Sequence, residues 1–169
     1  VAGMFNDIAF RYDFLNRFLS AGIDIRWRKK AIKQLQVIKP KIMLDVATGT
    51  ADVAIMASGI LKPDKITGID ISDGVRELGR KKIQKAGLES RIELLNGDCE
   101  TINFKNGSFD AVTVAFGVRN FENLEKGLSE ILRVLKPGGK LVVLEFSKPK
   151  SAFVKAFYNI YMKIITPNV

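Results

Sequence analysis

Histidine is absent from this 169-residue chain, and cysteine occurs only once, as Cys99. Without histidine the chain cannot form a Ser-His-Asp triad, and one cysteine cannot complete a Cys/His zinc site. We therefore predict no metal site. A lone cysteine also excludes a disulfide within the chain and is typical of a reducing compartment.

Long apolar runs are missing as well. None reaches the roughly 18–20 residues that a membrane-spanning helix needs, so we do not expect the chain to cross a bilayer. No signal peptide is visible, and Val1 begins in mid-pattern, which suggests residues upstream. These features predict a cytoplasmic protein.

Acidic residues are in the minority: 18 Asp and Glu face 27 Lys and Arg, for a net charge of +9. Such a balance favours an anionic partner, either nucleic acid or an acidic membrane surface. The remaining composition, 47% hydrophobic and 27% charged, is that of one globular domain.

Short apolar runs alternate with helical patterns through the middle of the chain. We expect strands at 41–47, 64–71, 91–98, 109–117 and 140–148, and helices at 51–61, 72–87 and 123–136. Ser72 is expected to cap the second helix and Gly87 to end it. In the third helix one face carries Leu124, Leu128, Ile131, Leu132 and Leu135, and Pro137-Gly138-Gly139 ends it. This alternation predicts a doubly wound, mainly parallel α/β sheet.

Aromatic residues gather near both ends, at 5–20 and 151–165, on more than one helical face. They either pack in the core or present one face to a greasy ligand or to lipid. We predict one domain with three parts: an N-terminal helical cap over the substrate (1–40), the α/β core (41–150) and the start of a C-terminal helical segment (151–169).

Small residues crowd the turn "LDVATGTAD" (44–52), which follows the first expected strand. Ala47, Gly49 and Ala51 alternate there, so the backbone can come close to a ligand, and the next helix offers free N–H groups. In an open α/β sheet, ligands bind beyond the carboxyl ends of the strands. Taken alone, the turn is either a dinucleotide fingerprint or a tight connection.

Three acids accompany this turn: Asp45, Asp70 and Asp98 lie at the ends of the first three expected strands. Asp70 is placed to take both ribose hydroxyls of an adenosine, and Asp98 to lie beside the adenine edge. Asp45 would repel the pyrophosphate of a nicotinamide cofactor but would neutralise an ammonium group. S-adenosylmethionine carries an ammonium and a sulfonium and no phosphate, so the charge pattern favours it.

Longer stretches resemble the C-methyltransferases of ubiquinone and menaquinone biosynthesis, a family of class I methyltransferases. They are "YDFLNRFLSAGIDIRWR" (12–28), "FGVRN" (116–120) and "RVLKPGGKLVVLEFSKP" (133–149), within a likeness that runs from Met4 to Lys150. The resemblance implies a Rossmann-like fold, and the chain ends at Val169, before the strand pair that closes such sheets.

The resemblance also implies a cofactor site. With the residues argued above, that site comprises Asp45, Ala47, Gly49, Thr50, Asp70, Ile71, Asp98, Cys99 and Ala115. Two departures stand out. Thr48 and Ala51 occupy positions where the family commonly has glycine, and Ala115 replaces a common serine, whose contact would be lost or replaced.

The reaction that the resemblance implies is methylation of a ring carbon of a polyprenylated quinol. Holding carbon, methyl and sulfur in line would supply most of the rate, and a base about 10²–10⁴-fold more. Without histidine the base is Asp, Tyr, Lys, Glu or a held water. Arg119, Tyr12 and Asp13 are the catalytic candidates. Arg119 has the alternative of a surface ion pair, and Tyr12 that of a core aromatic.

Other methyl acceptors fit less well. The stretch "AFGVRN" replaces the Asn/Asp-Pro-Pro-aromatic run of amino-methylating DNA enzymes, and Cys99 lacks the adjacent proline of a cytosine C5 nucleophile. RNA stays open as an acceptor, because residues 25–44 hold seven Lys or Arg and no acid and could follow a phosphate backbone. Another small molecule stays open as well. A non-catalytic S-adenosylmethionine-binding module also stays open.

We expect no nucleic-acid partner and leave oligomerisation open. We expect instead transient binding to an anionic membrane surface at the inner face of the cell membrane, where the insoluble quinol would be collected. Its headgroups would face the basic side chains of the stretch 26–41, namely Arg26, Arg28, Lys29, Lys30 and Lys33.

Overall fold

The computed structural model describes residues 23–146, so Tyr12, Asp13 and the aromatic segments at 5–20 and 151–165 lie outside the described residues. Five parallel strands form one sheet in the order β3-β2-β1-β4-β5. They are β1 (Ile42–Val46), β2 (Lys65–Asp70), β3 (Ile92–Asn96), β4 (Phe109–Ala115) and β5 (Leu135–Leu144). The chain winds outward from β1 through β2 to β3, then crosses back to β4, so the strand order reverses between β1 and β4.

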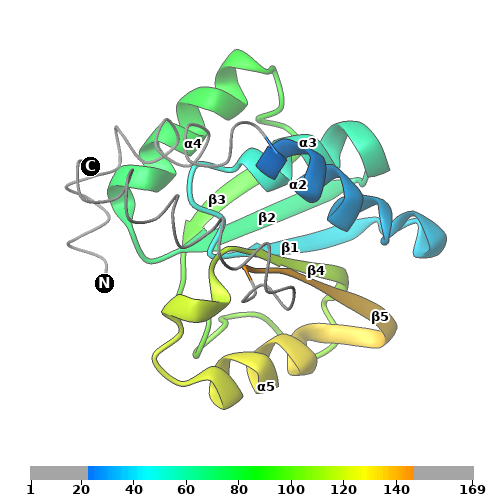
Figure 1. Cartoon of the computed structure of the whole chain (residues 1–169), viewed down its shortest axis with the longest axis vertical. Helices are drawn as coiled ribbons and strands as arrows, with labels where there is room; N and C mark the ends of the chain where they lie inside the picture. Colours follow the sequence, from blue (N-terminus) through cyan, green and yellow to red (C-terminus); the bar gives the residue numbers. More distant parts are fainter. Residues whose placement is uncertain (1–22, 147–169) are drawn as a thin grey trace, which may run out of the picture.

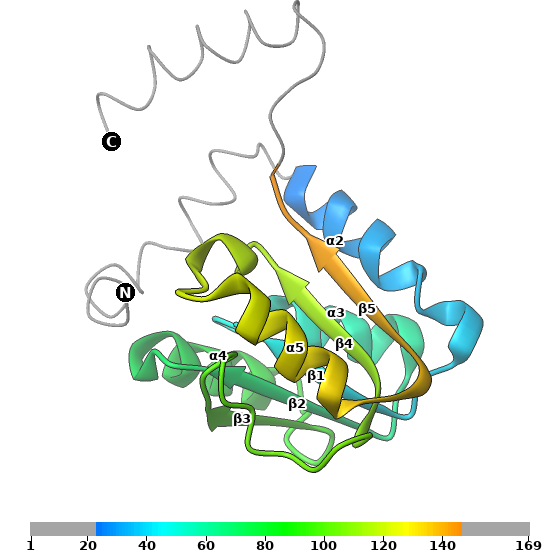
Figure 2. The same ribbon diagram turned by 90° about the horizontal axis from the view of Figure 1, so that it is seen from below.

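Helices cover both faces of this sheet. They are α2 (Ile23–Lys33), α3 (Asp52–Leu61), α4 (Asp73–Lys85) and α5 (Leu124–Val134), with 3₁₀ turns η1 (Gln36–Ile38) and η2 (Val118–Asn120). Helices α2, α3 and α4 lie on one face and α5 on the other (Figure 1). Seen from below, α5 lies in front of the sheet (Figure 2). The doubly wound α/β fold expected from the sequence is confirmed.

Two apolar clusters hold the layers together, one on each face of the sheet. The first joins Ile32 and Leu35, on and just after α2, to α3, α4 and strand residues such as Met43. The second joins Ile131 and Val134 of α5 to strand residues such as Val112. Because β1 and β4 are buried on both faces, their sequences are almost continuously apolar.

Several local expectations were wrong. The apolar face foreseen for α5 is split: Ile131 is fully buried beside Val134, whereas Leu132 is 73% exposed and Leu124 and Leu128 also face outward. Strand β5 begins directly after the helix, at Leu135, so the Pro-Gly-Gly run lies within the extended segment. Ser72 is the N-cap residue of α4, as expected, although its side chain makes no capping hydrogen bond.

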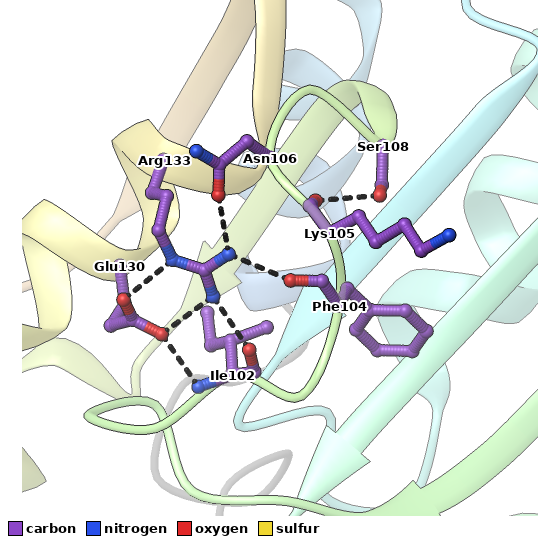
Figure 3. A network of polar contacts seen from close by, with 7 residues as sticks. All are labelled: Ile102, Phe104, Lys105, Asn106, Ser108, Glu130 and Arg133. Atoms are coloured by element: carbon purple, nitrogen blue, oxygen red, sulfur yellow. Dashed lines mark hydrogen bonds and ion pairs between the residues drawn. The ribbon is translucent and has the colours of Figure 1, made fainter.

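The connection from β3 to β4 contains no helix, and Arg133 of α5 fastens it (Figure 3). The guanidinium donates hydrogen bonds to the carbonyls of Ile102 and Phe104, both at 2.7 Å, and to Asn106 Oδ1 at 3.0 Å. Glu130 accepts from Arg133 through both carboxylate oxygens and from the amide of Ile102 at 2.9 Å. This pair fixes the segment that continues from the end of β3 over the sheet.

Within residues 23–146 no helix is both long and apolar enough to cross a bilayer. Helix α2 packs against α3 and β5. The three-part division of the chain at residues 40 and 150 stays a prediction.

Candidate cofactor and methyl-acceptor site

A cavity of about 280 Å³ opens beyond the carboxyl ends of the strands, where the strand order reverses. This is the place where open α/β sheets bind ligands. Its walls come from the segments after β1, β2, β3 and β4 and from the start of α4. They comprise Ala47, Gly49, Asp70, Ile71, Val75, Gly97, Asp98, Cys99, Glu100, Ala115, Phe116, Gly117, Asn120, Phe121 and Glu122. Seven of the residues foreseen from the sequence are among them.

The small-residue turn after β1 has an unusual backbone. Ala47, Gly49 and Ala51 all have positive φ angles, of 53°, 55° and 64°. Only glycine adopts such angles without strain, so the two alanines hold the turn at a cost of about 1 kcal/mol each. A Cβ atom on Gly49 would meet no atom within 4 Å, so this residue leaves open the space beside the turn.

Asp45 is buried beneath the turn and faces two threonines. Its Oδ2 accepts a hydrogen bond from Thr48 at 2.7 Å, and its Oδ1 accepts one from Thr113 at 2.5 Å. Burial raises the pKa of Asp45 to about 6, against the opposing effect of these two hydrogen bonds and of Arg28. Thr48, which stands where the family commonly has glycine, therefore stabilises a buried carboxyl group.

Asp70 joins the segment after β1 to the segment after β2 at the edge of the cavity. Its Oδ2 accepts from the amide of Gly49 at 2.9 Å, and its Oδ1 accepts from the amide of Ser72 at 3.0 Å. A carboxylate oxygen has two lone pairs, so each can accept a further hydrogen bond from a ligand. Asp70 thus fixes the turn and still faces the cavity.

Asp98, Cys99 and Glu100 form the wall after β3. Burial, and next the negative charge of Asp98, raise the pKa of Cys99 to about 12, so its sulfur stays a neutral thiol at physiological pH. A thiol of this kind is not a nucleophile. Glu100 accepts a hydrogen bond from the amide of Asn123 at 2.6 Å and so ties this wall to the start of α5.

Thr50 lies behind the turn, outside the residues that line the large cavity. It is 4% exposed, and its hydroxyl accepts a hydrogen bond from Lys82 Nζ at 2.8 Å. Lys82 also pairs with Asp52 at 2.8 Å, and Asp52 pairs with Arg28 at 3.0 Å. This ionic chain links α2, α3 and α4 behind the turn.

Aromatic rings gather at the ends of β4 and β5. Phe116, which lines the cavity and has a φ of 59°, stacks on Phe146 with ring centroids 4.8 Å apart. Trp27 of α2 meets Phe146 edge-on at 6.0 Å. Arg119 lies over the Phe146 ring at 5.4 Å and forms an ion pair with Glu145 at 2.6 Å. Arg119 itself does not line the cavity, although the next residue, Asn120, does.

Sequence reasoning missed several residues of the site. Thr113 lies in the middle of an apolar strand, and only the pairing of β1 with β4 brings it opposite Asp45. Phe116 and Asn120 lie inside "FGVRN", so that motif was the available signal for them. Within residues 23–146 no group of acidic, cysteine or histidine side chains is placed to hold a metal ion.

Solved structures with the same arrangement of strands and helices include proteins described as methyltransferases. A protein from Methanococcus maripaludis described as S-adenosyl-L-methionine-dependent superposes with a TM-score of 0.74 at 23% identity, covering 96% of this chain and 72% of that one. One from Thermotoga maritima gives a TM-score of 0.67 at 23% identity, over 96% of this chain and 69% of that one. These likenesses show that the chain has the fold of class I methyltransferases, with a cavity where such open α/β sheets bind ligands.

The match to sequence families is more specific. The chain belongs to the ubiE/COQ5 methyltransferase family, whose model matches residues 1–169. It is 49% identical to the demethylmenaquinone methyltransferase of Bacteroides fragilis over all its 169 residues, which cover 69% of that relative. It is 47% identical to the ubiquinone/menaquinone biosynthesis C-methyltransferase UbiE of Geobacter sulfurreducens, over 99% of this chain and 66% of that one.

Proposed function

We propose that the chain transfers a methyl group from S-adenosylmethionine to a ring carbon of a polyprenylated quinol, either demethylmenaquinol or a ubiquinol precursor. The observation that carries the proposal is the cavity at the reversal of strand order in a chain that belongs to this family. The names of the relatives from Bacteroides fragilis and Geobacter sulfurreducens support the quinol as acceptor.

The residues around the cavity fit the cofactor. Asp70 would accept hydrogen bonds from the ribose hydroxyls, and Asp98 and Cys99 would lie along the adenine, with Ile71 as an apolar wall. Gly49 leaves room for the methionine part, whose ammonium group is attracted by the buried Asp45. S-adenosylmethionine, when bound, supplies an electrophilic methyl group on a sulfonium, and the protein positions it.

The acceptor would lie on the Phe116 side of the cavity. A quinol ring can stack on an aromatic side chain, and Arg119, held by Glu145 and lying over Phe146, offers a positive charge to a deprotonated ring hydroxyl. A neighbouring oxygen that loses its proton makes the ring carbon nucleophilic. Tyr12 and Asp13 remain our candidates for the residues that cover this side and handle the proton.

A quinol with a polyprenyl tail is nearly insoluble in water, so we also propose transient contact with an anionic bilayer surface on the cytoplasmic side. Exposed basic residues of α2 support this, namely Arg26, Lys29, Lys30 and Lys33. Arg28 is not part of that surface, because its side chain is 12% exposed and pairs with Asp24 and Asp52.

The test compares methyl acceptors side by side. The protein is incubated with methyl-labelled S-adenosylmethionine and with demethylmenaquinol, a demethylated ubiquinol precursor, or tRNA. We expect label in at least one quinol at a ring carbon, located by mass spectrometry, and none in tRNA. Label in tRNA alone, or binding of the cofactor without transfer to either quinol, would overturn the proposal.

A further inference from the structure

A second, smaller cavity of about 40 Å³ adjoins the large one behind the small-residue turn. The two share Ala47, Gly49, Ala115 and Phe116 as lining residues, so a ligand against the turn reaches both. The smaller cavity is lined in addition by Arg28, Asp45, Thr48, Thr50, Asp52 and Val53. It therefore brings a largely buried cation, Arg28, and the fully buried carboxyl group of Asp45 to the same small space.

Arg28 has one N–H group without a partner. Its Nη1 donates to Asp52 at 3.0 Å, its Nη2 lies 3.5 Å from Asp24, and the guanidinium lies over the Phe116 ring at 5.6 Å. The Nε atom is buried and makes no hydrogen bond. Buried N–H groups of charged side chains are nearly always paired, because an unpaired one loses its hydration without compensation. The Nε–H group of Arg28 can therefore donate a hydrogen bond to an acceptor atom of a bound ligand.

The charges around the small cavity match those of an α-amino acid. Asp45 attracts an ammonium group, and its pKa responds to the charge of Arg28, so the two groups lie within electrostatic reach. A guanidinium binds a carboxylate through parallel N–H donors, and it does so most strongly where water is excluded. The lining holds one cation and two carboxyl groups, and the second carboxyl group, that of Asp52, is already paired with Arg28 and Lys82. Arg28 and Asp45 are therefore the charges that can complement a zwitterion.

We propose that Arg28 binds the α-carboxylate at the amino-acid end of S-adenosylmethionine. The inference rests on the proposed function and adds a specificity residue to it. A single ordered water on Nε is the competing occupant, since the cavity is large enough for one. Arg28 belongs to the stretch "RWR" in α2, so this helix would contribute directly to cofactor recognition and not only to packing.

Calorimetry with a ligand pair that differs only in the carboxylate tests this directly. S-adenosylmethionine and decarboxylated S-adenosylmethionine are titrated into the wild-type protein and into Arg28→Gln. We expect the wild type to prefer the carboxylated ligand by about 10–100-fold and Arg28→Gln to bind both ligands within about threefold. Arg26→Gln is the matched control on the exposed side of the same helix, and it should keep the wild-type preference.

Loss of the ion pair with Asp52 endangers folding, so Arg28→Lys is measured as well, with 5′-methylthioadenosine as a ligand that lacks the whole amino-acid end. Both variants should bind 5′-methylthioadenosine as the wild type does, which also shows that they are folded. Lysine keeps the charge, so Arg28→Lys should retain only part of the preference. Equal affinities of the wild type for the carboxylated and decarboxylated ligands would overturn the assignment while leaving methyl transfer intact. Parallel loss of 5′-methylthioadenosine binding would make Arg28 purely structural, and absence of wild-type binding to every ligand would instead defeat the proposed function.

Discussion

At the scale of single residues, Asp70 has two roles: it holds the amides of Gly49 and Ser72, and it would accept hydrogen bonds from the ribose hydroxyls of the cofactor. Asp70→Ala should weaken S-adenosylmethionine binding by about 10–100-fold, as expected for the loss of charge-assisted hydrogen bonds. Asp70→Asn keeps one oxygen to accept from Gly49 or Ser72 and should fall between the wild type and Asp70→Ala. Isothermal titration of the three proteins measures this. Unchanged affinity in a folded Asp70→Ala variant would remove Asp70 from the site.

Asp45 gives the protein a stability that depends on pH. Its pKa is about 6 in the folded chain against 3.8 ordinarily, so the folded state holds the proton more tightly than the unfolded state between these values. Stability contributed by this group is therefore lost as the pH rises from about 4 to 6. Asparagine does not titrate, so the free energy of unfolding of Asp45→Asn lacks this dependence on pH. The difference in free energy of unfolding between Asp45→Asn and the wild type should therefore change in favour of the variant by about 2–3 kcal/mol from pH 4 to pH 7. Urea unfolding at the two pH values measures the difference.

Asp110 is the control for Asp45, because its pKa is shifted in the opposite direction. Burial tends to raise its pKa, but hydrogen bonds from Lys136 and from the amides of Ile42 and Lys41 outweigh burial and lower it. Asp110→Asn should therefore be more destabilising at pH 7 than at pH 4. If both variants changed stability equally at the two pH values, the electrostatic explanation for Asp45 would be wrong.

Residues whose role depends only on their place in a local pattern could be predicted. Asp70, Asp98 and Gly49 were expected at the cavity because strand ends and small-residue turns are visible in sequence. Thr113 and the unpaired Nε of Arg28 could not, since their roles arise from neighbours 68 and 24 residues away, Asp45 and Asp52.

At the scale of elements, the Arg133–Glu130 pair fastens the helix-free crossover to α5. Arg133→Met should leave the carbonyls of Ile102 and Phe104 without these donors and lower the free energy of unfolding by about 2 kcal/mol. The same crossover carries Asp98 and Cys99, so cofactor affinity should fall too. Hydrogen exchange of residues 97–106 reports the loosening. Unchanged exchange in this segment would mean that the pair is dispensable.

Ile131 and Leu132 are adjacent in α5 but lie on different faces, so substituting each of them tests which face packs against the sheet. Ile131→Ala should cost about 2–4 kcal/mol because Ile131 is fully buried, whereas Leu132→Ala should cost under about 0.5 kcal/mol, since Leu132 is 73% exposed. Chemical denaturation of both variants checks the assignment of faces. Similar costs would show that Leu132 is covered in solution.

The strands were easier to predict than the packing of α5. Runs such as "FDAVTVA" are apolar throughout, as buried parallel strands require, so their positions follow from sequence. In α5, however, the leucines at 124, 128 and 132 and the buried Ile131 and Val134 lie on neighbouring faces. Hydrophobicity alone does not say which face of α5 meets the sheet. Gly127 has no side chain and so lets the helix approach Phe121 closely, and the face that is buried is the one with Ile131 and Val134.

At the scale of the whole molecule, the net charge of +9 and the basic face of α2 predict reversible membrane binding. The protein should co-sediment with anionic vesicles at low salt and be released as salt is raised, since each basic residue contributes about 1 kcal/mol and is screened. Replacing Lys29, Lys30 and Lys33 by Gln should weaken this binding by about 100-fold. Equal, negligible binding to neutral and anionic vesicles would leave delivery of the quinol to another protein.

The alanines of the turn after β1 affect the thermodynamics of binding as well as its geometry. A run of glycines would sample many shapes when empty, and a ligand would have to freeze one of them. Ala47 and Ala51 are confined to few backbone shapes, and Asp70 already fixes the amide of Gly49. A turn with these residues has little conformational entropy to lose when a ligand binds. Confinement of the turn by its own residues therefore lowers the entropic cost of binding a ligand.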